Sequence, residues 1–202
     1  WFKKRQRLFI VSDYPSNRFT DDQYHAIASQ VGAGAGFLMI GGWSSYRGLG
    51  GGYQKTLLGE VLPVRCLSRD DRVQGAPSYR MVRNLQARAF VNLNFDSAPS
   101  ICGYNRVIPK AEAQEILSVE TLSFDRRALR YHVVKTDPLL VLGHYGRGRS
   151  AALTTDLAPH WCGGLIDWGR RRLRISPAQG IVAEIGDAYF RFVKELLSLV
   201  LA

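Results

Sequence analysis

The sequence predicts an α/β fold in which helices cover a mostly parallel sheet that also carries one antiparallel hairpin. The first observation is the run 37–40, four apolar residues without polar alternation between glycines, which is typical of a strand buried on both faces. The second is a strand-like run over 7–13 and a helical pattern over 21–31, which with the central strand form a βαβ unit. The third is a pair of strand-like runs, 139–144 and 149–156, joined by a short glycine-bearing turn.

The first helix is predicted by its N-terminal cap. The Thr20 hydroxyl can accept a hydrogen bond from the third helical N–H while the Gln23 side chain reaches back to the cap. Asp21 and Asp22 place negative charge where the helix dipole favours it. Glycines follow residue 31 and end the helix, so the central strand comes next along the chain.

The remaining elements are predicted from weaker patterns. Thr56 can cap a short helix that ends before Pro63. Residues 69–109 show no clean period and predict loops with short strands, whereas 113–119 predicts a further strand. The last helix, over 186–201, is predicted from an apolar stripe that faces the core, formed by Tyr189, Val193, Leu196, Leu197 and Val200.

Length and composition narrow the class of protein. With 202 residues, of which 46% are hydrophobic and 22% charged, the chain fits one globular domain and not a disordered one. No apolar run approaches the roughly 20 residues that a membrane helix needs, so we expect no membrane span. The chain begins with Trp1, which predicts that residues upstream are missing. We expect a cytoplasmic location or, for a processed organellar protein, the mitochondrial matrix.

Three cysteines, Cys66, Cys102 and Cys162, lie far apart and form no CxxC pair. An odd, widely spaced set argues against a disulfide framework and a zinc site, and it fits a reducing compartment. We therefore predict three buried thiols and no bound metal or cofactor. Asp70 and Asp71 with a distant histidine lack the HxH or HExxH spacing of a metal site.

The net charge of +10 is high, and it gathers in clusters within 3–7, 126–130 and 170–174. Such a surplus promotes contact with phosphate polyanions such as RNA. No RNP aromatic pattern, KH loop or zinc finger accompanies the clusters, so a solvated basic surface is an equally good interpretation. The candidate nucleic-acid contacts are Arg170, Arg171, Arg172 and Arg174.

Polar side chains follow three predicted strands, at Asp13, at the turn 43–45 and at Asp156 with His160. If these strands are parallel neighbours, their ends meet at the edge of the sheet where α/β proteins bind ligands. A hydroxyl, an imidazole and a carboxylate are the parts of a Ser-His-Asp arrangement, which makes Ser44, His160 and Asp156 the catalytic candidates. The alternative is a structural turn whose tryptophan caps the core, since no G-x-S-x-G motif is present. Candidate binding residues are Asp13, Trp43, Ser45, Asn105 and Trp161.

Several segments together carry a resemblance that covers the chain from about Leu8 to the last helix. The segments are Ser12-Asp-Tyr-Pro15, Leu38-Met-Ile-Gly-Gly-Trp-Ser-Ser-Tyr46, Gly103-Tyr-Asn-Arg106, Thr155-Asp-Leu-Ala-Pro-His-Trp161 and Gly163-Gly-Leu-Ile-Asp-Trp-Gly169. In this order they resemble a bacterial family of glutamine amidotransferase-like proteins. The resemblance implies a class I glutamine amidotransferase-like domain, close to trehalose-utilisation-type domains, with a flavodoxin-like three-layer sandwich. It implies a single domain over 8–202 behind a basic leader, 1–7, without the strand and helix that usually come first.

The resemblance also implies where catalysis should be. Members of the superfamily place a cysteine at the turn after a central strand, with histidine and glutamate from a later segment. Here the turn reads Gly42-Trp43-Ser44, and His160 is followed by Trp161 instead of Pro-Glu. The departures imply a non-hydrolysing binding or structural protein, with an unknown small molecule at a strand-edge pocket. The alternatives are a subunit of a homo-oligomer or a ribonucleoprotein-like assembly, and an enzyme that uses Ser44 or Ser45 with His160.

Overall fold

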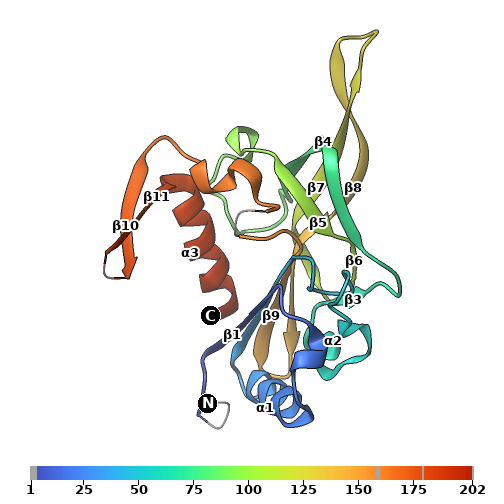
Figure 1. The fold of residues 1–202 in the computed structure, drawn as a ribbon, viewed down its shortest axis with the longest axis vertical. Helices are drawn as coiled ribbons and strands as arrows, with labels where there is room; N and C mark the ends of the chain where they lie inside the picture. Colours follow the sequence, from blue (N-terminus) through green and yellow to red (C-terminus); the bar gives the residue numbers. More distant parts are fainter. Residues whose placement is uncertain (1–3, 158–159, 179, 202) are drawn as a thin grey trace.

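A seven-stranded mixed sheet carries the fold in the computed structural model, which describes residues 4–157, 160–178 and 180–201 (Figure 1). Lys3 of the basic leader and Pro159 beside His160 lie outside the described residues. In sheet order the strands are β1 (Leu8–Ser12), β2 (Gly36–Ile40), β9 (Gly148–Leu153), β8 (Arg130–Tyr145), β7 (Gln114–Asp125), β4 (Arg72–Arg83) and β5 (Ile101–Asn105).

The directions of the strands correct the predicted sheet. β2 pairs in parallel with β1 and with β9, as the βαβ pattern predicts. The other four neighbouring pairs, β9–β8, β8–β7, β7–β4 and β4–β5, are antiparallel. A mostly parallel sheet was therefore the wrong expectation, because β8 returns through the predicted hairpin and β7 and β4 continue the alternation. The hairpin itself, between Leu140 and Leu153, is confirmed.

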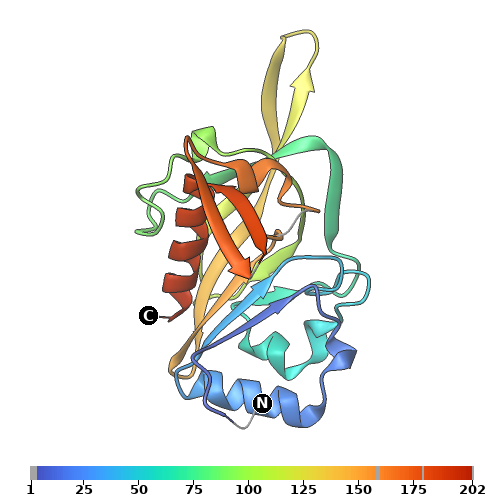
Figure 2. The same cartoon turned by 60° about the vertical axis from the view of Figure 1, so that its left-hand side comes forward.

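Helices lie on both faces of the sheet, so the chain is a mixed α/β protein with few helices (Figure 2). α1 (Asp21–Gly32) and α2 (Leu57–Val61) cover one face, where Phe37 and Met39 of β2 join their core. α3 (Asp187–Leu201) covers the other face, where Leu38 and Ile40 are buried. The prediction that β2 is buried on both faces is confirmed, since all five of its residues are buried.

The predicted helix ends are also confirmed. Thr20 accepts a hydrogen bond from the backbone N–H of Gln23, whose side chain accepts from the backbone N–H of Thr20. Thr56 caps α2 by accepting from the backbone N–H of Gly59. In α3 the most buried residues are Ala188, Tyr189, Phe192, Leu196 and Val200, with Val193 and Leu197 partly buried beside them.

The rest of the described chain forms smaller elements. β3 (Val64–Cys66) pairs with β6 (Val107–Pro109), and β10 (Arg172–Ala178) pairs with β11 (Ile181–Gly186). Within 69–109 the structure has a twelve-residue strand, β4, where loops with short strands were expected. Among the described residues, no helix has the length and apolar character to cross a bilayer. Short 3-10 helices occur at Ser16–Arg18, Tyr53–Lys55, Phe95–Ser97 and Gly163–Asp167.

Candidate functional site

Three strand ends converge at the carboxyl edge of β1, β2 and β9, because these strands are parallel neighbours. Asp13 leaves β1 with a positive φ of 46°, a conformation that Asp tolerates better than most residues and that turns the chain sharply. Its Oδ1 accepts a hydrogen bond from the backbone N–H of Ser44 at 2.5 Å. Its own N–H donates to the Oγ of Ser45 at 3.1 Å. The turns after β1 and β2 are therefore locked together.

The turn after β2 depends on two glycines and one buried hydroxyl. A Cβ on Gly41 would lie 2.0 Å from the carbonyl oxygen of Thr154, and a Cβ on Gly42 would lie 2.8 Å from the Oδ1 of Asp13, so neither position accepts a side chain. The Ser45 side chain is fully buried, and its Oγ donates to the carbonyl oxygen of Ile40 at 2.6 Å. The Ser45 hydroxyl thus holds the backbone and is closed to solvent.

Asn105 and Asp71 support this turn from β5 and from the residue before β4. The Asn105 side chain accepts from the N–H of Gly42 at 3.0 Å and donates to the carboxylate of Asp71 at 2.8 Å. That carboxylate also accepts from the backbone N–H groups of Arg47 and Gly48. Burial raises the pKa of Asp71, while its hydrogen bonds oppose the shift. Asp71 is the main residue of this network that the sequence did not assign.

Asp156 lies at the end of the segment that follows β9. Its carboxylate accepts from the backbone N–H of Trp161 at 3.0 Å and of Cys162 at 2.6 Å, so it caps the turn that carries both residues. Burial raises the pKa of Asp156, Asp13 adds to the rise, and His160 opposes it. Within the described chain no hydrogen bond joins His160, which is exposed, to the hydroxyl of Ser44 or Ser45.

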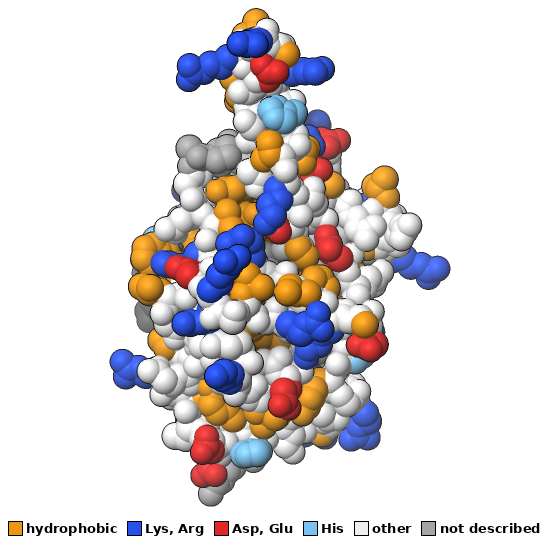
Figure 3. Space-filling model, turned by 90° about the vertical axis from the view of Figure 1, so that its right-hand side faces the viewer, with side chains coloured by type: hydrophobic (Ala, Val, Ile, Leu, Met, Phe, Trp, Pro, Cys, Tyr) orange, Lys and Arg blue, Asp and Glu red, His pale blue; other side chains and the backbone are white. Residues whose placement is uncertain are grey.

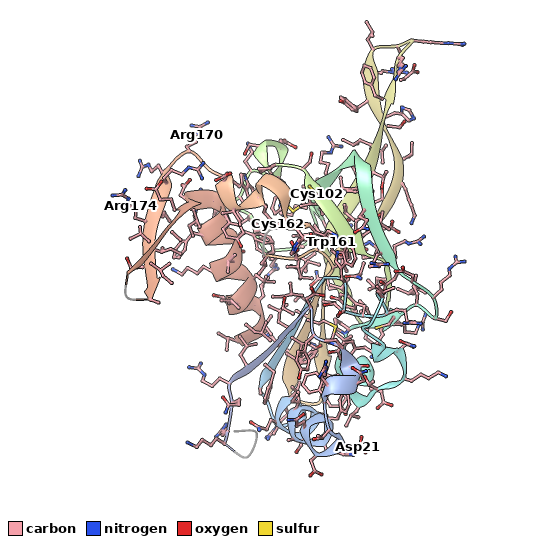
Figure 4. All side chains as sticks on the ribbon, viewed as in Figure 1. Asp21, Cys102, Trp161, Cys162, Arg170 and Arg174 are labelled. Atoms are coloured by element: carbon pink, nitrogen blue, oxygen red, sulfur yellow. The ribbon has the colours of Figure 1, made fainter. Side chains whose placement is uncertain are left out.

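Trp161 is buried and lies beside Cys102 and Cys162 (Figure 4). Its Nε1–H donates to the Oε1 of Gln74 at 3.2 Å, and its carbonyl accepts from the N–H of Cys102 at 2.6 Å. Cys102 itself is exposed and Cys66 is half-buried, which corrects the prediction of three buried thiols. Burial raises the pKa of Cys162 to about 11 and that of Cys66 to about 12.

The solvent side of the edge presents an aromatic ring and a cation. Trp43 is 45% exposed, and the guanidinium carbon of Arg72 lies 4.8 Å from its ring centroid, which is a cation–π contact. Asp70 holds Arg72 through a hydrogen bond of 2.7 Å, and this bond lowers the pKa of Asp70 to about 2. From the sequence, Asp70 was considered only as part of a metal site, and its pairing with Arg72 was not predicted.

A hollow of about 320 Å³ adjoins this edge along β1. The rings of Tyr14 and Phe19, 5.0 Å apart and edge to face, form part of its wall. Apolar and hydrogen-bonding groups both reach it, which suits a small molecule. The described residues include no group of three histidine, cysteine or carboxylate side chains that could hold a metal ion. The hollow is lined by Ile10, Val11, Ser12, Tyr14, Phe19 and Gln23.

The four candidate arginines of the last basic cluster differ in their partners. Arg172 forms an ion pair with Asp167, and Arg174 forms one with Glu184 at 2.8 Å. The side chains of Arg170 and Arg171 are exposed and make no ion pair with a described residue. Both line a hollow of about 460 Å³ to which Asn92, Asn94 and Arg191 also contribute.

The three basic clusters do not gather on one face. Figure 1 places the N-terminal residues at the bottom, the tip of the β7–β8 hairpin at the top and β10 at the left. Arg170 and Arg174 lie on the outer side, away from the strand edge that carries Trp161 (Figure 4).

Comparison with known proteins gives matches to one family and to solved structures. A family model described as "Putative glutamine amidotransferase", GATase1-like, matches residues 7–173. The chain is similar to a cytoplasmic protein of Salmonella typhimurium LT2, with 26% identity and a TM-score of 0.72 over 96% of this chain and 71% of that one. A second cytoplasmic protein of Salmonella typhimurium is 30% identical, with a TM-score of 0.64 over 78% of this chain and 63% of that one. This chain thus spans less than two thirds of the second protein. No curated protein sequence matches it.

Proposed function

This chain belongs to the GATase1-like family over residues 7–173, and we propose that it is a binding domain that does not hydrolyse glutamine. The observation that carries the proposal is the turn after β2. Its residues are Gly42, Trp43, Ser44 and Ser45, so no thiol stands where the resemblance expects the nucleophile. The buried Ser45 hydroxyl is bonded to backbone groups on both sides and cannot replace it. Three parallel strands with a helix between the first two support the kinship with flavodoxin-like domains.

Neither of the two shielded thiols is a substitute nucleophile. The thiolate is the reactive form of cysteine, and a raised pKa makes it scarce near neutral pH. Cys66 and Cys162 both have raised pKa values caused mainly by burial. Asp156 is engaged by two backbone N–H groups, which favours a structural role for it. Cys102 is the thiol open to solvent, and it stands on β5 and not at the turn.

A glutaminase assay on purified protein tests the proposal. We expect no ammonia release from L-glutamine above a protein-free control. Release at enzyme-like rates that is abolished by His160→Ala or by Cys102→Ser would overturn it. The two substitutions also distinguish which side chain is responsible, since His160 and Cys102 are both exposed and neither holds the fold through a described side-chain hydrogen bond.

The retained function in this proposal is binding at the strand edge. Trp43 is exposed at this edge, with the guanidinium of Arg72 over its ring. A thermal-shift screen with small metabolites should find a compound whose stabilising effect is lost in Trp43→Ala and kept in Leu49→Ala. Leu49 is a suitable control because it is an exposed apolar residue of the same loop. A screen in which both variants respond like the natural chain would contradict binding at Trp43.

Catalysis by serine is the weaker alternative. It requires a hydroxyl and an imidazole within about 3 Å of each other or joined by one water. Ser45 is turned to the backbone and Ser44 contributes its N–H to Asp13, whereas His160 faces solvent. These contacts favour a structural role for the turn over a nucleophile.

Contact with nucleic acid is the second candidate, and one observation favours it. The side chains of Arg170 and Arg171 are exposed and form no ion pair with a described residue, beside two asparagines in the same hollow. Asp187 also lines this hollow, where it accepts from the backbone N–H groups of both arginines and pairs with Arg191. Exposed arginines together with amide side chains are typical of phosphate-contacting surfaces. The ion pairs of Arg172 and Arg174 make those two residues less available.

A further inference from the structure

The β7–β8 hairpin extends beyond the body of the molecule as a free arm, which we define as residues 121–135. Figures 1 and 2 both show it standing clear of every other element. β7 pairs with β4 only as far as Thr121, and β8 pairs with β9 only from Leu140 onward. Between these points no described strand covers either edge of the arm. In the arm the two strands therefore pair only with each other.

The register of the arm separates an apolar face from a polar one. Leu122 lies opposite Val133, and Phe124 lies opposite Tyr131. Directly paired residues point to the same side of a ribbon, and residues two apart share a side. The four side chains therefore form one continuous apolar surface, which we call the arm face. The opposite side carries the pairs Ser123 with His132 and Asp125 with Arg130.

The arm face is open to solvent. Phe124 is 46% exposed, Tyr131 65% and Val133 43%, and the two rings stack with centroids 5.1 Å apart. Leu129 at the tip is exposed as well. Together these side chains expose on the order of 500 Å² of apolar surface, as much as the largest patch on a typical monomer, and such patches mark interaction sites.

We propose that two copies of this chain associate through their arms, with the two arm faces packed against each other about a two-fold axis. A two-fold contact uses the same patch twice, and an apolar face of aliphatic and aromatic side chains is complementary to itself. The two faces together reach roughly 1,000 Å², which is at the lower limit for a specific interface. A nucleic acid could meet the basic tip but would leave Leu122 and Val133 uncovered.

The charges of the arm select its orientation in such a pair. Arg126, Arg127 and Arg130 stand at or next to the tip, which Figure 3 shows as basic side chains around hydrophobic ones. Parallel arms would bring six arginines together. Antiparallel arms separate the two tips by roughly 20 Å, about six residues of strand, which exceeds the screening length of about 8 Å at physiological salt. We therefore place the tip of each arm over the base of the other.

Sedimentation velocity of the full chain tests the pairing. The natural chain should be dimeric, and Phe124→Ser with Tyr131→Ser should weaken the dimer at least about thirtyfold, because aromatic anchors at interface centres carry most of the affinity. Leu85→Ser and Val91→Ser are matched controls, since both are exposed apolar residues outside the arm, and they should leave the dimer unchanged. Circular dichroism checks that every variant is folded.

Cross-linking adds a measurement that depends on which face is buried. In a Cys102→Ser background, Tyr131→Cys should form a disulfide between copies, because its rung lies midway along the arm and so beside the two-fold axis, whereas His132→Cys on the polar face should not. A monomer at concentrations up to about 100 μM, a dimer that survives the double arm variant, or equal cross-linking at 131 and 132 would each overturn the proposal. Binding of the monomeric chain to anionic vesicles or to RNA through Phe124 and Tyr131 would overturn it in favour of that partner.

Discussion

At the residue scale, the polar side chains of the strand edge mainly bond to backbone groups. Ser45 and Asp156 each engage backbone groups, and Asn105 with Asp71 fastens the turn after β2. The sequence predicted that polar groups would meet at this edge, because strand ends and parallel order follow from local patterns. It could not predict the bonds of Asn105, since its partners Gly42 and Asp71 lie 63 and 34 residues away in the chain and depend on the completed fold.

Asp71 should be far more important for stability than its neighbour Asp70. Asp71→Ala leaves the N–H groups of Arg47 and Gly48 and the Asn105 amide without their acceptor in a buried place, so we expect a loss of roughly 3 kcal/mol or more in the free energy of unfolding. Asp70→Ala removes an exposed ion pair with Arg72 and should have a much smaller effect. Urea denaturation measures both, and equal losses would contradict the assignment.

Asp156 should make stability depend on pH in an unusual direction. Its pKa is raised in the folded chain above the ordinary value of 3.8, mainly by burial, so the folded state binds the proton more tightly than the unfolded state does. Its contribution to stability is therefore full below 3.8 and is lost as pH rises through the folded pKa. The free energy of unfolding of the natural chain minus that of Asp156→Asn should increase as pH falls from about 8 to about 4. A difference that stays constant or decreases would contradict this.

Thiol labelling should distinguish the three cysteines. Cys102 is exposed, whereas Cys66 and Cys162 are shielded and have pKa values raised to about 12 and about 11. A thiol reagent near neutral pH should modify Cys102 quickly and the other two at least about a hundredfold more slowly, because both access and thiolate fraction are low. Mass spectrometry after digestion identifies the sites. Guanidinium-unfolded chain is the control, in which all three should react alike.

At the element scale, the sequence predicted correctly those helices and strands that are encoded by short-range patterns. The cap of α1, the fully apolar β2 and the glycine turn of the β8–β9 hairpin were all found, because each has a short-range cause. β4 was missed because it carries no clean alternation, with a register shift between Gln74 and Tyr79. Without β4, the antiparallel half of the sheet could not be predicted.

The cap of α1 should stabilise the chain by a measurable amount. Thr20→Ala removes the acceptor for the N–H of Gln23 and breaks the reciprocal pair, so we expect a loss of about 1 kcal/mol in the free energy of unfolding. Ser29→Ala, at an exposed interior position of the same helix, is the matched control and should be neutral or slightly stabilising. Denaturant unfolding of the two variants gives the comparison. A Thr20→Ala variant as stable as the control would mean that the cap is not important.

At the scale of the whole molecule, the candidate sites divide between the strand edge and the periphery. The edge holds polar groups, Trp43 and a small hollow, whereas the arm and the β10–β11 hairpin extend outward with most of the exposed arginines described above (Figure 1). Sequence patterns located the basic clusters but not their positions, because three segments far apart in the chain are placed by tertiary structure. Their separation means that each cluster must be tested by itself.

For the cluster at 170–174, the ion pairs predict an order among the arginines. Phosphate contacts cause affinity to fall with salt, by a log–log slope of about −0.7 for each contact on single strands. If RNA binds here, changing Arg170 and Arg171 to Ala should make the slope less steep by roughly 1.4. Arg174→Ala should change it much less, because the Arg174 side chain is already paired with Glu184 at 2.8 Å. Fluorescence anisotropy with a labelled single-stranded RNA at rising salt measures the slopes. An affinity that does not change with salt, or equal effects of Arg174→Ala and the double change, would mean that these arginines form an ordinary solvated surface and do not bind RNA.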